Sequence, residues 1–370
     1  MLFRSEAFKA RGGDGLHDFA RFEALAEANW PSKLGEAVGE HQVDEDRVEY
    51  AKYLQWQCEV QLGEVATVCA SAGMPVGLYR DLAVGADGDG AEVWSEPHLY
   101  ATGVNLGAPP DELALQGQAW GLTPWIPRAM AGAAFQPFIK CLRANMRHAG
   151  ALRIDHIVGL MRQFWVPNDL GPMVGGYVEN PFSTLLAILA IESERHQCLV
   201  IGEDLGTIPD ALRIALAETR ILSYKVLYFE KNWEHTQAFT APEAYPECAL
   251  VTVSTHDLPT LAGFCQGSDL AIRSRLGLFA NEEALQNARH GRIDDLQRLA
   301  HALGGAAISG DPGPALAEVP DDAWVAAVHG YLARTPSQLM CAQIEDLLGE
   351  VSQVNVPGTV AEEPNWRRKL

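Results

Sequence analysis

Six short apolar, β-rich runs, separated by stretches of helical character, are the feature that most constrains the fold. The runs are Val76–Tyr79, Ala151–Ile154, Cys198–Ile201, Tyr224–Tyr228, Leu250–Ser254 and, more weakly, Gln338–Ala342. Continuous apolar strands that alternate with helices are typical of a parallel sheet covered on both faces. Helical spacing is clear over residues 16–40, 46–71 and 282–303. The chain is therefore predicted to be an α/β protein.

Acidic residues follow five of the six runs. They are Asp81, Asp155, Glu203–Asp204, Asp257 and Glu345–Asp346. In a βα barrel the C-terminal ends of the strands form one rim, where such enzymes place their chemistry. A doubly wound sheet would also gather these acids along one edge, but more dispersed, and a single acid is common at a helix N-cap. Acids after five of six runs favour a (β/α)8 TIM barrel.

The number of predicted strands is two short of a closed barrel. Such a barrel needs eight strands, whereas six runs are visible and the roughly 75 residues before the first run look helical. We expect either two unrecognised strands or a chain that lacks the beginning of its barrel.

Charge and cysteine content exclude several classes of function. The 28 Lys+Arg against 48 Asp+Glu give a net charge of −20, which argues against nucleic acid or an anionic membrane as partner. No apolar run approaches the roughly 20 residues of a membrane span, and the N-terminus lacks the plan of a secretory signal. Seven scattered cysteines without a Cys-x-x-Cys pair indicate free thiols in a reducing cytoplasm rather than a zinc site.

Three of these acids could cleave a glycosidic bond if they lie on one rim of the barrel. Two carboxylates that flank a glycosidic bond are the standard means of cleaving it. Crowding of like charges raises the pKa of at least one carboxyl group, which then stays protonated as an acid. Asp155, Glu203 and Asp257 could supply this pair and a third carboxylate for an oxocarbenium-like transition state.

Basic side chains adjoin these acids. Arg153 precedes Asp155 by two residues, so strand alternation points both to one face, where the guanidinium would keep the carboxylate ionised. His156 and His256 can donate hydrogen bonds to sugar hydroxyls. A metal site built from the same acids and histidines is weaker, because the chain has no His-x-x-x-His or His-x-His pair. Each motif taken alone is also compatible with a simple helix cap.

Several stretches resemble a known family. Residues 153–156, 202–206 and 254–257 resemble three signature regions of the α-amylase clan. Stretches that ordinary amylases lack narrow the resemblance to the amylomaltases, or 4-α-glucanotransferases, of glycoside hydrolase family 77. These are Gly107–Asp111 with Gly117–Gly121, Glu345–Gly349, and Gln353–Thr359 with Pro364–Arg368. The resemblance runs from about Phe8 to Leu370.

The resemblance implies a role for individual residues. It implies Asp155 as nucleophile, Glu203 as general acid/base and Asp257 as the transition-state carboxylate. It further implies sugar contacts for Arg153, His156 and His256, and it matches Asp81 to the family's first signature region, with Asp89 and Trp94 in the loop that follows. Residues 117–121 resemble a loop that arches over the cleft, where Trp120 could stack on a glucose ring or simply pack within the loop.

The resemblance also implies a domain plan. The family fold places its first two barrel strands ahead of a segment like Phe8–Trp30, which stands at the start of this chain. We expect one incomplete catalytic barrel domain over residues 1–370. It would carry an active-site loop or insertion at 84–150 and a helical insertion at 265–334, between the fifth and sixth visible strands.

The implied activity is 4-α-glucanotransfer by a retaining double displacement. A segment of α-1,4-glucan would pass through a covalent glucosyl-Asp155 intermediate to the 4-OH of an acceptor. Expected partners are maltooligosaccharides, amylose and glycogen-type chains, with glucose or maltose as acceptors, and no cofactor or metal is expected. The alternatives are an α-glucan hydrolase with the same acids and an inactive glucan-binding remnant.

Overall fold

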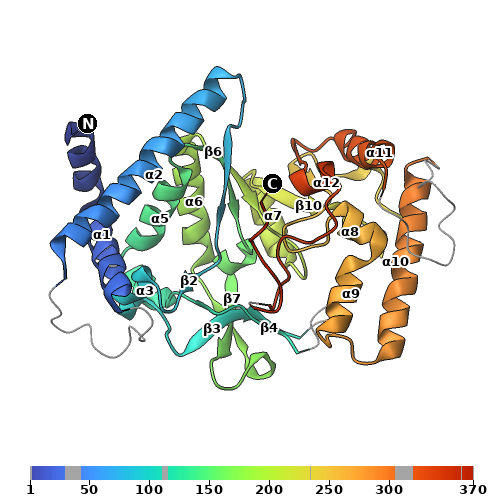
Figure 1. The fold of residues 1–370 in the computed structure, drawn as a ribbon, viewed down its shortest axis with the longest axis horizontal. Coiled ribbons are helices and arrows are strands. Elements are labelled where there is room, and N and C mark those ends of the chain that lie inside the picture. The colour runs from blue at the N-terminus through green and yellow to red at the C-terminus, as the bar shows by residue number, and fades with distance from the viewer. Residues whose placement is uncertain are drawn as a thin grey trace. The chain divides into compact units, whose positions relative to one another are not determined.

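The computed structural model describes residues 2–29, 43–110, 116–233, 235–304, 320–359 and 361–369 (Figure 1). Residues 30–40 of the first predicted helix, Asp111, Leu370 and residues 305–319 of the predicted helical insertion lie outside these ranges. The chain divides into two compact units. Unit 1 comprises residues 1–204 and 208–213, and unit 2 comprises residues 205–207 and 214–370. Within the described ranges, no helix combines the length and apolar character that crossing a membrane requires.

Unit 1 is built on parallel strands. β1 (Leu78–Leu82) pairs with β6 (Ala149–Ile154), which pairs with β9 (Leu199–Gly202). The last four residues of β6 are all buried, as expected for a central strand covered on both faces. Leu82, Ile154 and Gly202 stand in register. The three strands therefore end at one level, and the residues that follow them start from neighbouring positions.

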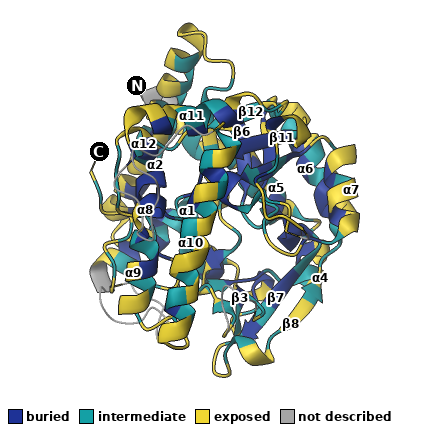
Figure 2. Ribbon diagram, turned by 90° about the vertical axis from the view of Figure 1, so that its right-hand side faces the viewer, coloured by how far each residue is buried: buried dark blue, intermediate teal, exposed yellow. Residues whose placement is uncertain are grey.

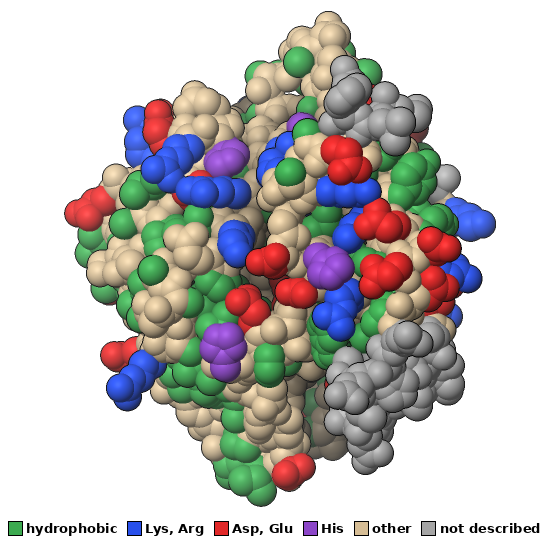
Figure 3. Space-filling view, turned by 90° about the vertical axis from the view of Figure 1, so that its left-hand side faces the viewer, with side chains coloured by type: hydrophobic (Ala, Val, Ile, Leu, Met, Phe, Trp, Pro, Cys, Tyr) green, Lys and Arg blue, Asp and Glu red, His purple; other side chains and the backbone are tan. Residues whose placement is uncertain are grey.

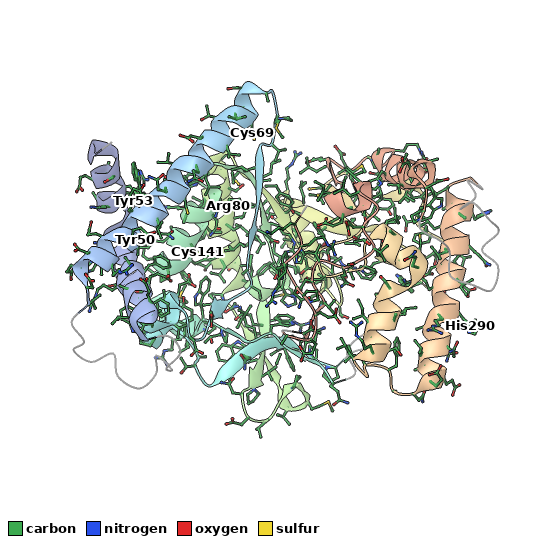
Figure 4. The ribbon with its side chains drawn as sticks, viewed as in Figure 1. Tyr50, Tyr53, Cys69, Arg80, Cys141 and His290 are labelled. Atoms are coloured by element: carbon green, nitrogen blue, oxygen red, sulfur yellow. The ribbon has the colours of Figure 1, made fainter. Side chains whose placement is uncertain are left out.

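Two helices cover this sheet. α5 (Gln136–Met146) buries Phe138, Leu142 and Met146 along one face and packs against β6 and α6 (Phe182–His196). Figure 4 labels Arg80 on β1 and Cys141 on α5. The Arg80 guanidinium donates to the carbonyl oxygens of Ala144 and Asn145, at 3.1 and 3.3 Å. It thereby satisfies carbonyls that the end of a helix leaves without an intrahelical partner.

The two N-terminal helices of unit 1 are α1 (Leu2–Asn29) and α2 (Glu45–Ser71). They pack against each other and run in opposite directions (Figure 1). Small buried residues at their contact, Ala20, Ala24, Val48 and Ala51, let the two backbones approach closely. Figure 3 shows the face on this side, where acidic and basic side chains are interspersed. The two helices are also joined by the ion pairs Lys9–Glu49 and Arg11–Glu59.

A second, antiparallel sheet in unit 1 was not predicted. Its strand order is β4 (Gln118–Ala119), β3 (Val104–Ala108), β7 (Arg162–Pro167) and β8 (Gly176–Glu179), and a separate ladder joins β2 (Ala86–Asp87) to β5 (Leu122–Thr123). The two-residue strands carry no periodicity that a sequence pattern could reveal. Gly107 is required where β3 meets β4, because a Cβ there would lie 2.0 Å from the Gln118 carbonyl oxygen. Short helices complete the unit: α3 (Ala91–Ser95), η1 (Pro97–Leu99), α4 (Pro127–Gly132), η2 (Ile157–Leu160) and η3 (Pro172–Val174).

Unit 2 is likewise built on parallel strands. β10 (Leu222–Val226) pairs with β11 (Ala249–Thr252), which pairs with β12 (Leu339–Cys341). Every residue of β11 is buried, and Figure 2 shows this strand in dark blue against a largely exposed α10. The helical elements are α8 (Leu261–Gln266), α9 (Ser268–Arg275), α10 (Glu282–Ala302), α11 (Asp322–Ala333), α12 (Ile344–Leu347), η4 (Leu227–Phe229) and η5 (Pro242–Ala244). α7 (Asp210–Glu218) begins in unit 1 and ends in unit 2.

The six predicted strands are confirmed, with differences at their boundaries. The first begins at Leu78 rather than Val76, because Gly77 adopts a φ of +66° that ends the preceding turn. Asp81 therefore lies within β1, whereas the sequence pattern placed it after the strand. The fifth strand ends at Thr252, so Asp257 is reached through a turn instead of following the strand directly. The predicted helix at 282–303 corresponds to α10.

Candidate active site

Asp155 and Glu203 directly follow neighbouring strands of unit 1. Asp155 comes immediately after β6, and its backbone N–H donates to the Leu82 carbonyl oxygen at 3.0 Å. Glu203 comes immediately after β9, and its N–H donates to the Ile154 carbonyl oxygen at 3.0 Å. These bonds extend the parallel ladder one residue beyond the strands. The main chain of the sheet thus sets where both acids stand.

The turn after Asp155 donates two further backbone hydrogen bonds to Glu203. His156 is in the left-handed region, with φ 48° and ψ 58°, and its N–H donates to Glu203 Oε2 at 2.9 Å. The next N–H, that of Ile157, donates to the Glu203 carbonyl oxygen at 3.0 Å. A left-handed conformation in a non-glycine residue is unfavourable by about 1 kcal/mol or more, so the surrounding contacts must hold it. Gly202 makes room for this turn, since a Cβ there would lie 2.5 Å from Ile157 Cδ1.

Arg153 supplies the positive charge of the site. Its Nη1 donates to Asp81 Oδ1 and Oδ2 at 2.8 and 2.9 Å, and its Nη2 lies 2.8 Å from Asp155 Oδ1. Only 7% of Arg153 is exposed. Burial by itself would lower the pKa of Arg153, but the charges of Asp155 and Asp81 raise it well above its usual value. The guanidinium is therefore a permanent cation that favours the ionised form of Asp155.

His156 and Trp120 lie together at the same turn. Their rings meet edge to face, with centroids 5.0 Å apart and an interplanar angle of 75°. The Trp120 indole N–H donates to Gln118 Oε1 at 3.0 Å, and the Trp120 backbone N–H donates to the Leu106 carbonyl oxygen at 2.9 Å. Burial lowers the pKa of His156 to about 4. The imidazole is therefore neutral near pH 7, and the structure places Trp120 against the turn that carries Asp155.

A cavity of about 230 Å³ opens beside this turn. Asp155 and His156 form part of its wall, and the rest is mostly apolar and aromatic, with Tyr100, Trp125 and Cys141 among the lining residues. Burial raises the pKa of Tyr100 to about 12 and that of Cys141 to about 11. Both groups stay protonated near neutral pH, so neither competes with Asp155 as a nucleophile.

The two remaining candidates from the first signature loop have contacts of their own. Asp89 is exposed and lies in a turn, where its backbone N–H donates to Asp87 Oδ1 at 3.0 Å. Trp94 lies on α3, and its ring packs against Phe22 of α1 with centroids 5.9 Å apart. Trp94 thus connects α3 to the N-terminal helices within unit 1.

Asp257 and His256 lie in unit 2, in the turn after β11. His256 Nε2 is 3.2 Å from Asp257 Oδ2, and the Asn355 side-chain amide donates to Asp257 Oδ1 at 2.6 Å. The His256 ring also lies 5.1 Å from the Trp366 ring, measured between centroids. In the sequence, Asn355 and Trp366 stand out only as members of the stretches that carry the family resemblance. Their role beside Asp257 could not be read from spacing, because each is about a hundred residues away in the chain.

The acid after the sixth strand has a structural position. Asp346 is 1% exposed, and its Oδ1 accepts the Leu261 backbone N–H at 2.6 Å, at the start of α8. Burial raises the pKa of Asp346 to about 6, against the opposing effect of this N–H. Asp346 therefore has a structural contact with the first N–H of α8, whose N-cap is Thr260, in contrast to the acids after β6 and β9. Within the described ranges, no group of three or more His, Cys, Asp or Glu side chains could hold a metal ion.

Fold and site together define a class of protein. It is an α/β protein of the barrel type, with a pair of carboxylates at the C-terminal ends of adjacent parallel strands and a buried arginine between two acids. In barrel enzymes this end of the sheet is where catalysis takes place.

Comparisons with known proteins narrow this class to one family. A family model described as 4-alpha-glucanotransferase matches residues 3–370. The chain is 42% identical to a 4-alpha-glucanotransferase of Haemophilus influenzae, over 88% of this chain and 46% of that protein. It is 37% identical to a 4-alpha-glucanotransferase of Mycobacterium tuberculosis, over 98% of this chain and 51% of that protein. The chain therefore belongs to the 4-alpha-glucanotransferase family, and it spans about half the length of these relatives.

The fold agrees with this assignment. The crystal structure of amylomaltase from Corynebacterium glutamicum matches with a TM-score of 0.86 and 34% sequence identity, over 99% of this chain and 52% of that one. The predicted α/β barrel fold of the amylomaltase type is thereby confirmed for the region that the chain covers.

Proposed function

We propose that this chain carries the catalytic acids of a 4-α-glucanotransferase that acts on α-1,4-glucans by a retaining double displacement. One observation carries the proposal: Asp155 and Glu203 stand at the ends of neighbouring strands and are joined by the His156 N–H to Glu203 Oε2 bond. Retaining glycosidases need their two carboxyl groups about 5–5.5 Å apart. Acids fixed on adjacent strand ends suit that requirement.

The nucleophile in this proposal is Asp155. Its contact with the permanently charged Arg153 favours the carboxylate over the acid, and a nucleophile must be ionised to attack. About a third of the Asp155 side chain is exposed, so the carboxylate remains accessible to a sugar. Attack on the anomeric carbon would give the covalent glucosyl-Asp155 intermediate while the glycosidic bond breaks.

Glu203 acts as the general acid and then as the general base. Because the His156 N–H donates to Oε2, that oxygen is an acceptor, and in the proposed mechanism Oε1 carries the acidic proton. Oε1 would protonate the departing glycosidic oxygen in the first step. The resulting carboxylate would take the proton from the acceptor 4-OH in the second step, and the transferred chain keeps its α configuration.

The other residues of the site are assigned supporting tasks. Asp257 serves as the transition-state carboxylate. His156, neutral near pH 7, and His256 hydrogen-bond sugar hydroxyls. Trp120 covers the ring, which favours an acceptor sugar over water. Asp81 holds Arg153 in place.

The proposal extends to partners, setting and domain plan. Donors are maltooligosaccharides, amylose or glycogen-type chains, and acceptors are glucose or maltose. The seven cysteines are free, which supports a reducing, cytoplasmic setting. Residues 84–150 form the active-site insertion and residues 265–334 a helical insertion of one catalytic barrel domain.

Incubation of the chain with maltotriose tests the proposal. A transferase gives glucose together with maltooligosaccharides longer than maltotriose, and D155N abolishes both products. Formation of shorter products alone would identify a hydrolase with the same acids. Binding of maltooligosaccharides without turnover would identify a glucan-binding remnant.

A further inference from the structure

The segment Gln353–Thr359, which carries part of the family resemblance but has no task so far, lies against the turn that holds Asp257. The Asn355 side-chain amide donates to Asp257 Oδ1 at 2.6 Å. The Asn355 backbone N–H donates to the His256 carbonyl oxygen at 3.0 Å. One residue therefore contacts both the backbone of this turn and the carboxylate that the turn presents.

Gln353 fastens the same two segments together. Its Nε2 donates to the Asp257 carbonyl oxygen at 2.8 Å and to the Asn355 carbonyl oxygen at 2.7 Å. Both hydrogens of one amide nitrogen are thus used, one on each segment. Together with the Asn355 N–H bond to the His256 carbonyl oxygen, this side chain holds the backbones of Asp257 and Asn355 at a fixed separation.

The segment that presents Asn355 is itself braced. Asn365 accepts the Val356 N–H at 3.0 Å and donates to the Thr359 carbonyl oxygen at 3.0 Å. Arg368 donates to the Gln353 carbonyl oxygen at 3.3 Å. A donor is useful for orientation only if its own position is fixed, and these bonds fix the backbone on both sides of Asn355.

The Asp257 carboxylate is oriented but not covered. Oδ1 accepts from Asn355, Oδ2 faces His256 Nε2 at 3.2 Å, and 42% of the side chain is still exposed. We propose that Asn355, with Gln353 as its support, is the positioning residue that orients Asp257 toward the transferred sugar. This inference rests on the proposed function for its effect on catalysis, whereas the orientation of Asp257 can be tested without turnover.

The uncharged amide of Asn355 is essential to this role. An amide donates to the carboxylate without adding a second negative charge, whereas an aspartate in its place would bring two carboxyl groups to hydrogen-bond distance. Like charges so close favour a shared proton, so N355D would lose the orienting bond above the pKa of the pair and add negative charge next to His256.

The catalytic test compares N355A and N355D with a matched control, N281A. Asn281 caps α10 by accepting the Ala284 N–H at 2.8 Å, so N281A also loses one side-chain hydrogen bond in unit 2 but leaves Asp257 untouched. We expect N355A and N355D to lower kcat on maltotriose by about 100-fold, because a small misplacement of a catalytic group has effects of this size, with KM changed less than threefold. N281A should lower the melting temperature and keep kcat.

A second measurement needs no activity. N355A removes the bond to Asp257 without changing any charge, so titration of the His256 ring by NMR should show a midpoint in N355A that differs from that of the parent chain, and an unchanged midpoint in N281A. If the parent chain does not turn over maltotriose, the proposed function fails while this measurement still decides the orientation of Asp257. An unchanged His256 midpoint in folded N355A, or equal kcat losses in N355A and N281A, would overturn the inference.

Discussion

The candidate acids of unit 1 and unit 2 are held in place by different means. Asp155 and Glu203 follow β6 and β9 without a gap, and backbone N–H groups of neighbouring strands and turns fix them. Asp257 stands beyond the end of β11, where the parallel ladder no longer reaches. The side-chain amides of Asn355 and Gln353 instead donate hydrogen bonds to the carboxylate and the carbonyl oxygen of Asp257. Strand register can therefore place an acid only at the strand end, and a more distant acid needs partners from elsewhere in the chain.

The largest effect is expected from removing Arg153, the buried cation that contacts both Asp81 and Asp155. R153M leaves Asp81 and Asp155 close together without the guanidinium between them. The pKa of Asp155 should then rise, because an opposite charge that favoured ionisation is gone. We expect transfer activity at pH 7 to fall by about 100- to 1000-fold, and the acidic limb of the pH–rate profile to move to higher pH.

The control for this experiment is R143M. Arg143 donates to Glu192 at 2.9 Å from both Nε and Nη2, which is also an arginine–carboxylate pair in unit 1, but between α5 and α6. It should leave the pH–rate profile in place. An R153M enzyme with the parental acidic limb would show that Arg153 does not set the ionisation of Asp155.

Substitution of Gly202 can disrupt the backbone hydrogen bonds that the 155–157 turn donates to Glu203. In G202A the new methyl group would meet Ile157 Cδ1 at 2.5 Å, which forces the 155–157 turn away from Glu203. We expect about 100-fold lower kcat and a loss of roughly 1–3 kcal/mol in the free energy of unfolding, as is usual for overpacking. Chemical denaturation and maltotriose kinetics measure the two effects. Parental kcat in folded G202A would show that this turn does not position the acid.

In unit 2, Asp346 is an acid with a structural contact, whereas Asp257 is a candidate catalytic acid, and the two are expected to respond differently to substitution. Its pKa is raised from 3.8 to about 6 in the folded state, so folding favours the protonated form. The ionised form therefore carries a penalty that is absent below about pH 4 and complete above about pH 6, and amounts to roughly 3 kcal/mol.

D346N should remove this penalty and still accept the Leu261 N–H. We expect its free energy of unfolding to exceed that of the parent by about 1–3 kcal/mol at pH 7 and to match it near pH 4. Urea denaturation at both pH values measures the difference, with kcat expected to remain parental. Equal stabilities at pH 7 would mean that Asp346 ionises in the folded protein without penalty.

The smallest effect is expected at Trp120. W120A removes the ring that packs on His156 but leaves the carboxylates and Arg153 in place. We expect the ratio of hydrolysis to transfer to rise severalfold, because water then competes better with the acceptor sugar, while total turnover falls by less than about tenfold. Product analysis after incubation with maltotriose gives this ratio. An unchanged ratio would support the interpretation of Trp120 as a loop-packing residue.

Some elements of this fold are encoded in local sequence patterns, whereas others depend on contacts between distant residues. The helix at 282–303 and the six strands follow from local periodicity, which the chain carries whatever its neighbours do. The antiparallel sheet around β3 and β7 was missed, because β3 pairs with β7 across 57 to 63 residues of chain and with the two-residue β4, which no local pattern shows. Asp81 was placed after a strand instead of within it, because Gly77 delays the start of β1.

Local patterns in the sequence predict the α/β class, the parallel strands and the position of Asp155 and Glu203 immediately after two of them. These features depend on side-chain alternation and burial within short windows. Three contacts arise only when the chain is folded: the His156 N–H with Glu203, Asn355 with Asp257, and Asp346 with the first N–H of α8. Each of these contacts joins residues 47 to 98 positions apart, and such pairings depend on strand register and turn geometry that no local pattern encodes.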